Sequence, residues 1–230
     1  MPASLRLLAI AATAAALGAL APAASAASFL SVRVSAATGA TSIALDTGAP
    51  ATGAPSPLAR ATLTLPAGFR LVPRAACARD TVLLTPGRCP ARSRVGGGTG
   101  RFAAYNSGAR APGGRLDAVA RLAAYAGPGG TLLLRAELAR PIPQALVYEA
   151  RVAGRQIVLS LAQGDVAGFE LTPAFLRLTL GGPNGAGYVR RASGCPAGGW
   201  GFAALLRYRP YNGRPPDSPL RLAGAAPCGR

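Results

Sequence analysis

Short runs of alternating apolar and polar residues constrain the fold of this chain more than any other feature. Residues 30–35 (LSVRVS) and 175–180 (FLRLTL) carry valine or leucine at every second position, and residues 61–65 and 202–209 follow the same pattern. A period of two points successive side chains to opposite faces of a strand, one toward a core and the other toward solvent. The pattern therefore predicts antiparallel strands.

Turn residues separate these runs from further strand candidates. Residues 116–125, 131–138, 144–152 and 155–161 are also predicted to be strands, and Ala153-Gly154 is predicted to form a tight hairpin turn between the last two. With 30 glycines and 21 prolines in 230 residues, long helices are not expected beyond the N-terminal segment. About ten short strands at this spacing predict an all-β fold. We expect a two-layer antiparallel β-sandwich, immunoglobulin-like or jelly-roll-like, with a closed β-barrel as the alternative.

The N-terminus has the order of features that secretory signal peptides share. Arg6 precedes an apolar stretch from Leu7 to Leu20, and Pro22 comes before the small residues Ala24-Ser25-Ala26. A membrane anchor is the alternative interpretation, but the stretch is shorter than the roughly 20 residues that a spanning helix needs. The sequence therefore predicts a signal peptide at residues 1–26 and a secreted, extracytoplasmic protein.

The remainder of the chain, residues 27–230, is predicted to be a single β-sandwich domain. Residues 47–57 (TGAPATGAPSP) are small, rich in proline and uncharged, so a flexible loop is expected there. No other apolar run reaches spanning length, so no transmembrane segment is expected after signal cleavage.

Four cysteines follow the signal peptide: Cys77, Cys89, Cys195 and Cys228. An even number in an exported chain favours disulfides, for which three connectivities are possible. We favour the local pairs Cys77–Cys89 and Cys195–Cys228, because each brackets turn-rich sequence. A zinc site is the rival hypothesis, but these spacings contain no Cys-x-x-Cys pair. No metal and no cofactor are expected.

Several of these elements occur in an order that resembles a known group of proteins. The elements are an LPxGF turn at 65–69, Cys77, a CPxxSxVG segment at 89–96, Cys-Pro with a following Trp-x-Phe at 195–202, and Pro-Cys at 227–228. Together they resemble a group of uncharacterised secreted β-rich proteins of high-GC actinobacteria. The resemblance implies a β-rich fold and export, and it implies no activity.

The absence of histidine and lysine removes most common catalytic systems. No imidazole base, Ser–His–Asp triad, Schiff-base lysine or Walker lysine can be built from this chain. A carboxylate pair is the remaining option, and Glu137 and Glu149 lie on neighbouring predicted strands where they could act as a glycosidase pair. We instead expect both on a solvated sheet face beside Arg135 and Arg151. The protein is therefore predicted not to be an enzyme.

The glycine-rich run at residues 96–100 (GGGTG) invites comparison with phosphate-binding loops. No βαβ pattern surrounds this run, and the next acid, Asp117, falls within a predicted strand rather than at a strand end. We therefore expect the glycines to serve the scaffold, by permitting a β-bulge or close packing of the sheet.

Positive charge is the one feature that suggests a ligand. All 25 basic residues are arginine, against eight acids, which gives a net charge of +17, or +16 without Arg6. Residues 70–101 hold seven arginines and one acid, and residues 171–216 hold six arginines and none. Arginine forms bidentate contacts with phosphate and carboxylate. The candidate polyanion-binding residues are Arg88, Arg92, Arg94 and Arg101.

Two partners fit these observations, an anionic cell-envelope polymer or another envelope protein. Nucleic acid is not expected as a dedicated partner, because the chain is predicted to be exported and has few aromatic residues for base stacking. The arginine content can also be read as compositional, since the chain is rich in the residues that GC-rich codons specify. The sequence thus predicts a secreted, non-enzymatic structural or binding module at the cell envelope. The alternative is an arginine-mediated binder of anionic polymers, and a carboxylate-based hydrolase is the third hypothesis.

Overall fold

The computed structural model describes residues 29–35, 40–46, 56–106, 115–139, 143–161, 165–166, 169–183, 185–191, 194–210 and 215–228. The predicted signal peptide at 1–26 and residues 47–55 of the predicted loop lie outside this part of the chain.

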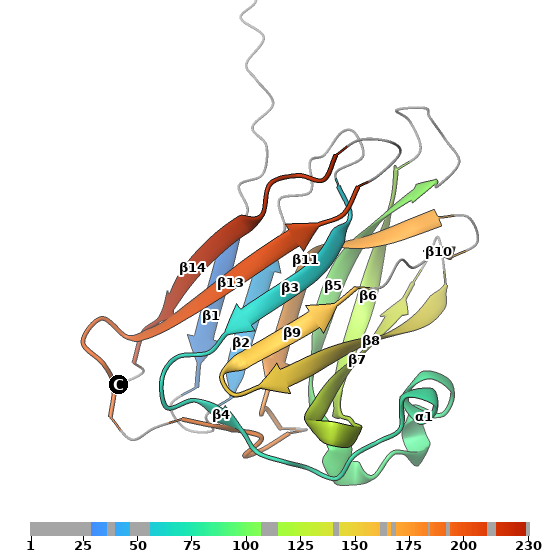
Figure 1. Ribbon diagram of the computed structural model, residues 1–230. Coiled ribbons are helices and arrows are strands. Elements are labelled where there is room, and N and C mark those ends of the chain that lie inside the picture. The colour runs from blue at the N-terminus through green and yellow to red at the C-terminus, as the bar shows by residue number, and fades with distance from the viewer. Residues whose placement is uncertain are drawn as a thin grey trace, which may run out of the picture.

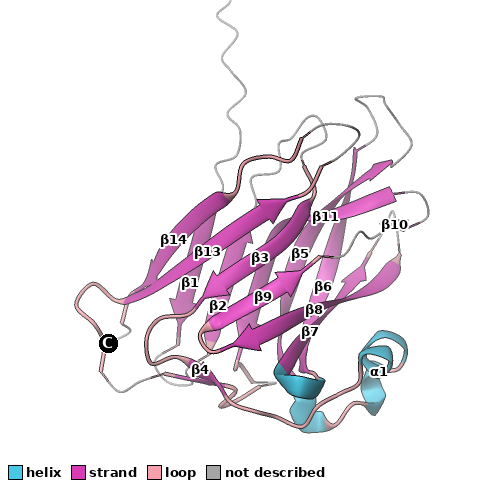
Figure 2. Cartoon of the chain, viewed as in Figure 1, coloured by secondary structure: helices cyan, strands magenta, loops and turns pink. Residues whose placement is uncertain are grey.

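Strands make up most of the described chain, and Figure 2 shows them with the few helices. In chain order the strands are β1 (Phe29–Val34), β2 (Thr41–Asp46), β3 (Leu58–Thr64), β4 (Arg70–Leu71), β5 (Arg94–Asn106), β6 (Arg115–Ala126), β7 (Thr131–Leu138), β8 (Gln144–Ala153), β9 (Gln156–Ser160), β10 (Asp165–Val166), β11 (Phe169–Leu180), β12 (Val189–Arg190), β13 (Trp200–Tyr208) and β14 (Leu220–Ala226). The helical elements are α1 (Arg79–Leu84) and the 3-10 turns η1 (Pro86–Arg88), η2 (Ala91–Ser93) and η3 (Pro128–Gly130).

One continuous antiparallel sheet contains most of these strands. Its order is β1-β2-β11-β5-β6-β7-β8-β9-β3-β13-β14, with β10 added beside β11, while β4 and β12 pair separately. The sheet folds over, so that β14, β13, β3 and β9 lie in front of β1, β2, β11 and β5 (Figure 1). The end strands β1 and β14 then lie side by side: a Cβ placed on Gly224 would be 2.7 Å from the backbone oxygen of Leu30. The sheet is thus a flattened, nearly closed barrel.

This architecture confirms the all-β prediction. Two layers are present, as in a sandwich, but hydrogen-bonded neighbours continue from one layer into the other through β6, β7 and β8, as the barrel alternative requires. The predicted hairpin joins β8 to β9, with Gly154 and Arg155 in the turn, one residue later than expected. Gly154 has a φ of 57°, a left-handed conformation that glycine adopts without steric cost.

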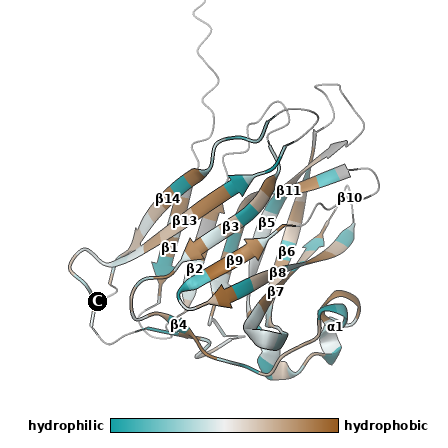
Figure 3. Cartoon of the chain, viewed as in Figure 1, coloured by the Kyte–Doolittle hydropathy of each residue, from teal (hydrophilic) through white to brown (hydrophobic). Residues whose placement is uncertain are grey.

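The alternating pattern determines which side chains form the core. In β11, Leu176, Leu178 and Leu180 point inward, and the register aligns Leu178 with Ile43 of β2. Leu63 of β3 also packs into this core from the other layer. Figure 3 shows the resulting bands of hydrophobic and hydrophilic residues along the strands.

A second, smaller cluster lies under α1 on the outer face of the sheet. Val82 of the helix is fully buried there, together with Tyr125, Leu133 and Val147 from β6, β7 and β8. The helix was not expected from the sequence. It covers apolar side chains that the strand pattern would otherwise leave facing solvent.

The glycines of β5 allow two strands to approach closely, as the sequence predicted. A Cβ on Gly98 would collide with the backbone oxygen of Arg177, and a Cβ on Gly96 would collide with that of Thr179, both in β11. The register also shifts between Arg94 and Gly96, which is the expected β-bulge. The run therefore lies within a paired strand of the sheet and does not form a loop.

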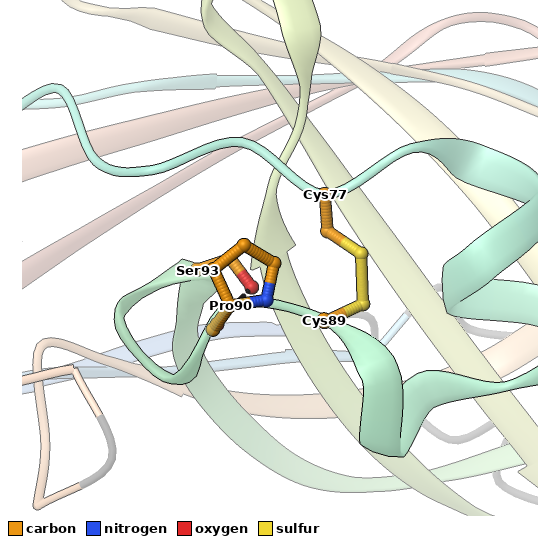
Figure 4. The surroundings of a disulfide bond; sticks show 4 residues. All are labelled: Cys77, Cys89, Pro90 and Ser93. Atoms are coloured by element: carbon orange, nitrogen blue, oxygen red, sulfur yellow. Dashed lines mark hydrogen bonds between the residues drawn. A yellow bond between two sulfur atoms is a disulfide. The ribbon is translucent and has the colours of Figure 1, made fainter.

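Both disulfides lie at the end of the barrel where β5 and β13 begin, which we call the disulfide end. Cys77–Cys89 precedes β5, and Cys195–Cys228 joins the segment before β13 to the segment after β14. Cys77 pairs with Cys89 and Cys195 pairs with Cys228, at Cα–Cα distances of 5.4 and 6.0 Å, which confirms the predicted connectivity. Beside the first bridge, the Ser93 hydroxyl donates to the backbone oxygen of Pro90 at 2.7 Å (Figure 4). This turn directs the chain into β5.

An aromatic cluster fills the interior at the disulfide end. The ring of Phe69 meets Trp200 at a centroid distance of 4.9 Å and Phe202 at 5.6 Å, both edge to face. Trp200 and Phe202 both point inward, and Gly201 between them faces outward and is exposed, as the period of two in a strand requires.

Polar contacts close the opposite end, where β5 ends and β11 begins, which we call the polar end. The carboxylate of buried Glu170 forms an ion pair with the Arg209 guanidinium. The amide of Leu58 donates to the Thr172 hydroxyl at 3.0 Å. The backbone amide of Ser56 donates to the Asp217 carboxylate at 3.2 Å, and the backbone amide of Asp217 donates to the Ser56 hydroxyl at 2.9 Å. These contacts join segments that are far apart in the sequence.

Candidate functional site

The four arginines predicted to bind polyanions divide into two pairs. Arg94 and Arg101 lie on β5, whereas Arg88 and Arg92 lie on the 3-10 turns that precede it. All four are exposed. Of the four, only Arg94 lines the groove described next.

The groove is a hollow of about 540 Å³ on the outer face of the sheet, over the start of β5. Gly97 faces outward and has no side chain, so the floor of the groove is backbone; a Cβ there would lie 3.9 Å from Nη2 of Arg94. Arg121 of β6 lines one side and Thr179 of β11 the other. Its full lining is Arg94, Gly96, Gly97, Gly98, Thr99, Arg121, Leu122, Thr179, Gly182 and Pro183.

The strand register extends this groove into a longer basic strip. It places Arg177 of β11 and Arg121 of β6 on either side of Thr99 in β5. Neighbouring strands are about 4.8 Å apart, so these two arginines are separated by about 10 Å across β5. Arg94 and Arg101, seven residues apart in β5, lie about 23 Å from each other along the strand. We call the surface framed by these four arginines the basic strip.

An aromatic ring holds two arginines of the basic strip. The guanidinium carbons of Arg101 and Arg177 lie 5.8 and 5.7 Å from the ring centroid of Phe175, within the range of cation–π attraction. Such contacts restrict the arginine rotamers without neutralising their charge. The guanidinium groups therefore remain available to an anion.

Three described acids lie near the basic strip: Glu137, Asp46, and Asp117, which is four residues from Arg121 on the same face of β6. Glu137 lies opposite Arg121 in the register, but its carboxylate accepts from Nη1 of Arg135 at 2.7 Å. Asp46 lies opposite Phe175 at the edge of the strip. No described carboxylate is in ion-pair contact with Arg94 or Arg121.

The suggested catalytic pair of Glu137 and Glu149 is not brought together. In the register of β7 and β8, Glu149 lies opposite Leu133, four residues from Glu137. At about 3.3 Å per residue, this offset corresponds to about 13 Å, which exceeds the separation of a glycosidase pair. Both acids are on the exposed outer face, as the solvated-face interpretation predicted.

The polar end contains ionisable groups that sequence reasoning did not single out. Burial lowers the pKa of the Arg209 guanidinium, and burial raises the pKa of the Tyr148 hydroxyl well above its ordinary value. The pKa of Tyr208 rises to about 12, first through burial and then through the nearby Asp217 carboxylate. With the tyrosines neutral and Glu170 paired to Arg209, these groups serve to close the barrel.

No three of the metal-binding residue types His, Cys, Asp and Glu gather into a candidate metal site in the described chain. None of the helices described is long and apolar enough to cross a membrane. No protein-family model, no curated protein and no solved structure matches this chain.

Arg121 and Arg177 were not selected from the sequence, although both occupy outward positions of predicted strands. Their neighbours on β5 could not be identified, because no alternating pattern marked the glycine-rich part of β5 and its partner strands were unknown. Strand order is therefore what turns dispersed arginines into a basic strip.

Proposed function

We propose that this protein is a non-enzymatic binding module of the cell envelope, and that its basic strip binds an anionic polymer. The observation that carries the proposal is the groove in which Arg94 and Arg121 flank a backbone floor formed by glycines. Guanidinium groups form forked hydrogen bonds with phosphate and carboxylate oxygens. An anion seated over Gly97 would meet such groups from two strands.

The shape of the basic strip favours a linear polymer over a small anion. Arginines stand on both sides of β5, about 10 Å apart, and others lie about 23 Å apart along it. A chain of phosphate or uronate units that runs along β5 would meet successive guanidinium groups. Multiple contacts of this kind add up, even where each exposed ion pair is weak.

Two further features support an extracytoplasmic place of action. Both cysteine pairs are disulfide-bonded, which is typical of proteins in oxidising compartments. The N-terminal sequence also has the features of a secretory signal peptide. Teichoic-type polyphosphates and uronate polymers are anionic ligands that a protein meets in such a place.

The proposal is tested by co-sedimentation of the mature protein with purified cell envelope and by titration with polyphosphate and polyuronate over a salt series. We expect binding that persists at physiological salt and weakens in Arg94→Gln/Arg121→Gln. Loss of two phosphate contacts should lower the slope of log K against log salt by roughly 1.4–1.8.

A matched control separates the groove from net charge alone. Arg60 and Arg207 are exposed and lie opposite each other on β3 and β13, in the other layer. Arg60→Gln/Arg207→Gln removes the same charge and should leave most of the binding intact. Equal loss in both double variants, or binding only at low salt, would contradict a dedicated site and leave a structural role.

A further inference from the structure

The interior of the barrel contains a cavity between the two layers, separate from the basic strip. Its volume is about 90 Å³. Side chains from both layers line it, including Leu30, Ile43 and Leu178 from one layer and Leu63, Leu159 and Ala204 from the other. The lining is aliphatic except for Thr62.

The register shows that this space is left by inward-pointing side chains. Ile43 and Leu178 lie opposite each other in β2 and β11, and Leu63 lies opposite Ala204 in β3 and β13. Leu63 and Leu178 belong to the core but remain only partly buried, because they border the cavity. Small side chains, including Ala204, leave room where a leucine would fill the space.

Size and chemistry together restrict what the cavity can hold. A water molecule needs a cavity volume of roughly 10–15 Å³, and it also needs two to four polar partners. The volume here is several times larger, but the aliphatic walls offer almost no partners. Apolar cavities of this type stay dry and take up hydrocarbon or noble-gas ligands.

The two ends of the barrel keep the cavity away from polar groups. The cluster of Phe69, Trp200 and Phe202 lies toward the disulfide end, and the stacked rings of Phe102 and Tyr148, 6.1 Å apart, lie toward the polar end. Apart from Thr62, the residues that a ligand held between them would contact are aliphatic.

The seam between β1 and β14 offers a route to the interior. In the described sheet, β1 is hydrogen-bonded to β2 and β14 to β13, so the hydrogen-bonded path ends at these two strands. Leu30 of β1 lines the cavity and contacts the seam at Gly224. Separating these strands would open the barrel while leaving each strand paired on its other side.

We propose that this cavity is a binding site for an uncharged hydrocarbon group, either a small free hydrocarbon or the end of an acyl chain. The site is independent of the basic strip. No polar group of the ligand needs to be recognised there. Binding would be driven by the transfer of apolar surface out of water, and the shape of the cavity would limit which groups fit.

The test is titration of the ¹⁵N-labelled mature protein with benzene, n-octane and sodium octanoate in separate arms. We expect saturable shifts of the amides of Leu63, Leu159 and Leu178. Binding of octanoate alone would identify the ligand as the end of an acyl chain, and binding of the hydrocarbons alone would identify a free hydrocarbon. No saturable shift in any arm would overturn the proposal.

A variant pair on one strand locates the site. Ala204→Leu fills the cavity and should weaken binding by about tenfold or more, because a filled site must overpack to admit a ligand. Ala203→Leu, at the adjacent exposed position, should bind like the wild type. Ala150→Val provides a milder filling of the same cavity if Ala204→Leu does not fold. Unchanged binding in a folded filling variant would also overturn the proposal.

Discussion

The two ends of the barrel are closed in different ways. The disulfide end has two covalent bridges and an interior cluster of aromatic rings. At the polar end, an ion pair and side-chain hydrogen bonds connect segments up to 161 residues apart in sequence. The disulfides stabilise the fold mainly by reducing the conformational entropy of the unfolded chain. The contacts at the polar end instead stabilise it through the arrangement of buried polar groups in the native state. The two ends should therefore respond differently to mutation, reduction and pH.

The largest expected effect is at the polar end. Arg209→Met leaves the carboxylate of Glu170, whose side chain is 5% exposed, without its partner. Removal of one member of a buried ion pair typically costs about 3–5 kcal/mol of unfolding free energy. Urea denaturation should show this loss, and Arg209→Met/Glu170→Met should recover most of it. If Arg209→Met alone were as stable as the wild type, water must solvate the ion pair, contrary to its burial here.

Loss of the disulfides should come next. Cys195→Ser/Cys228→Ser opens a loop of 33 residues and Cys77→Ser/Cys89→Ser one of 12. The chain-entropy model gives losses of about 4 and about 3 kcal/mol, respectively. Thermal melting of both double variants, compared with reduced wild type, checks the order. Melting curves that coincide with that of the oxidised protein would exclude a stabilising role for the bridges.

High pH should weaken both ends through their tyrosines. Burial raises the pKa of Tyr188, near the disulfide end, to about 12, and that of Tyr208 at the polar end is also about 12. A folded-state pKa above the unfolded value of about 10 gives stability that is complete below pH 10 and is lost as pH rises toward 12. Urea titrations from pH 8 to 12 should show this fall. Tyr188→Phe and Tyr208→Phe should each reduce it, and a flat profile in the wild type would contradict the assignment.

The smallest expected effect concerns the Ser56–Asp217 contact. Ser56→Ala removes one of two reciprocal hydrogen bonds, which should cost about 1 kcal/mol. Thr62→Ala, at a partly buried position in β3, is a comparison for the loss of a hydroxyl elsewhere in the wall. A loss above about 3 kcal/mol would show that this contact, and not the ion pair, closes the polar end.

The two ends also differ in how well they can be predicted from the sequence. The disulfide end depends on signals that are local in the chain: cysteines that bracket turns, Ser93 three residues after Pro90, and a period of two that places Trp200 and Phe202 on one face. The cysteine pairing was predicted from this local signal and is present. The alternating strands β1, β3, β11 and β13 were predicted for the same reason.

The polar end and the basic strip depend on strand order, which no local pattern specifies. Glu170 and Arg209 are 39 positions apart and looked like ordinary charged residues. Residues 96–100 of β5 include four glycines, which are depleted in strands and hide its alternating pattern, so Arg121 and Arg177 could not be assigned to its two sides. β2 and β14 are short segments with weak patterns and were missed as well.

Locating a bound polymer on the protein surface tests the proposed binding site on the basic strip most directly. Amide chemical shifts of the ¹⁵N-labelled mature protein should be followed during titration with polyphosphate at physiological salt. We expect the largest shifts at Gly97, Gly98 and Thr99, which line the groove. Shifts of similar size around Arg60 and Arg207 on the opposite layer, or no saturable shifts, would contradict a dedicated polymer-binding site.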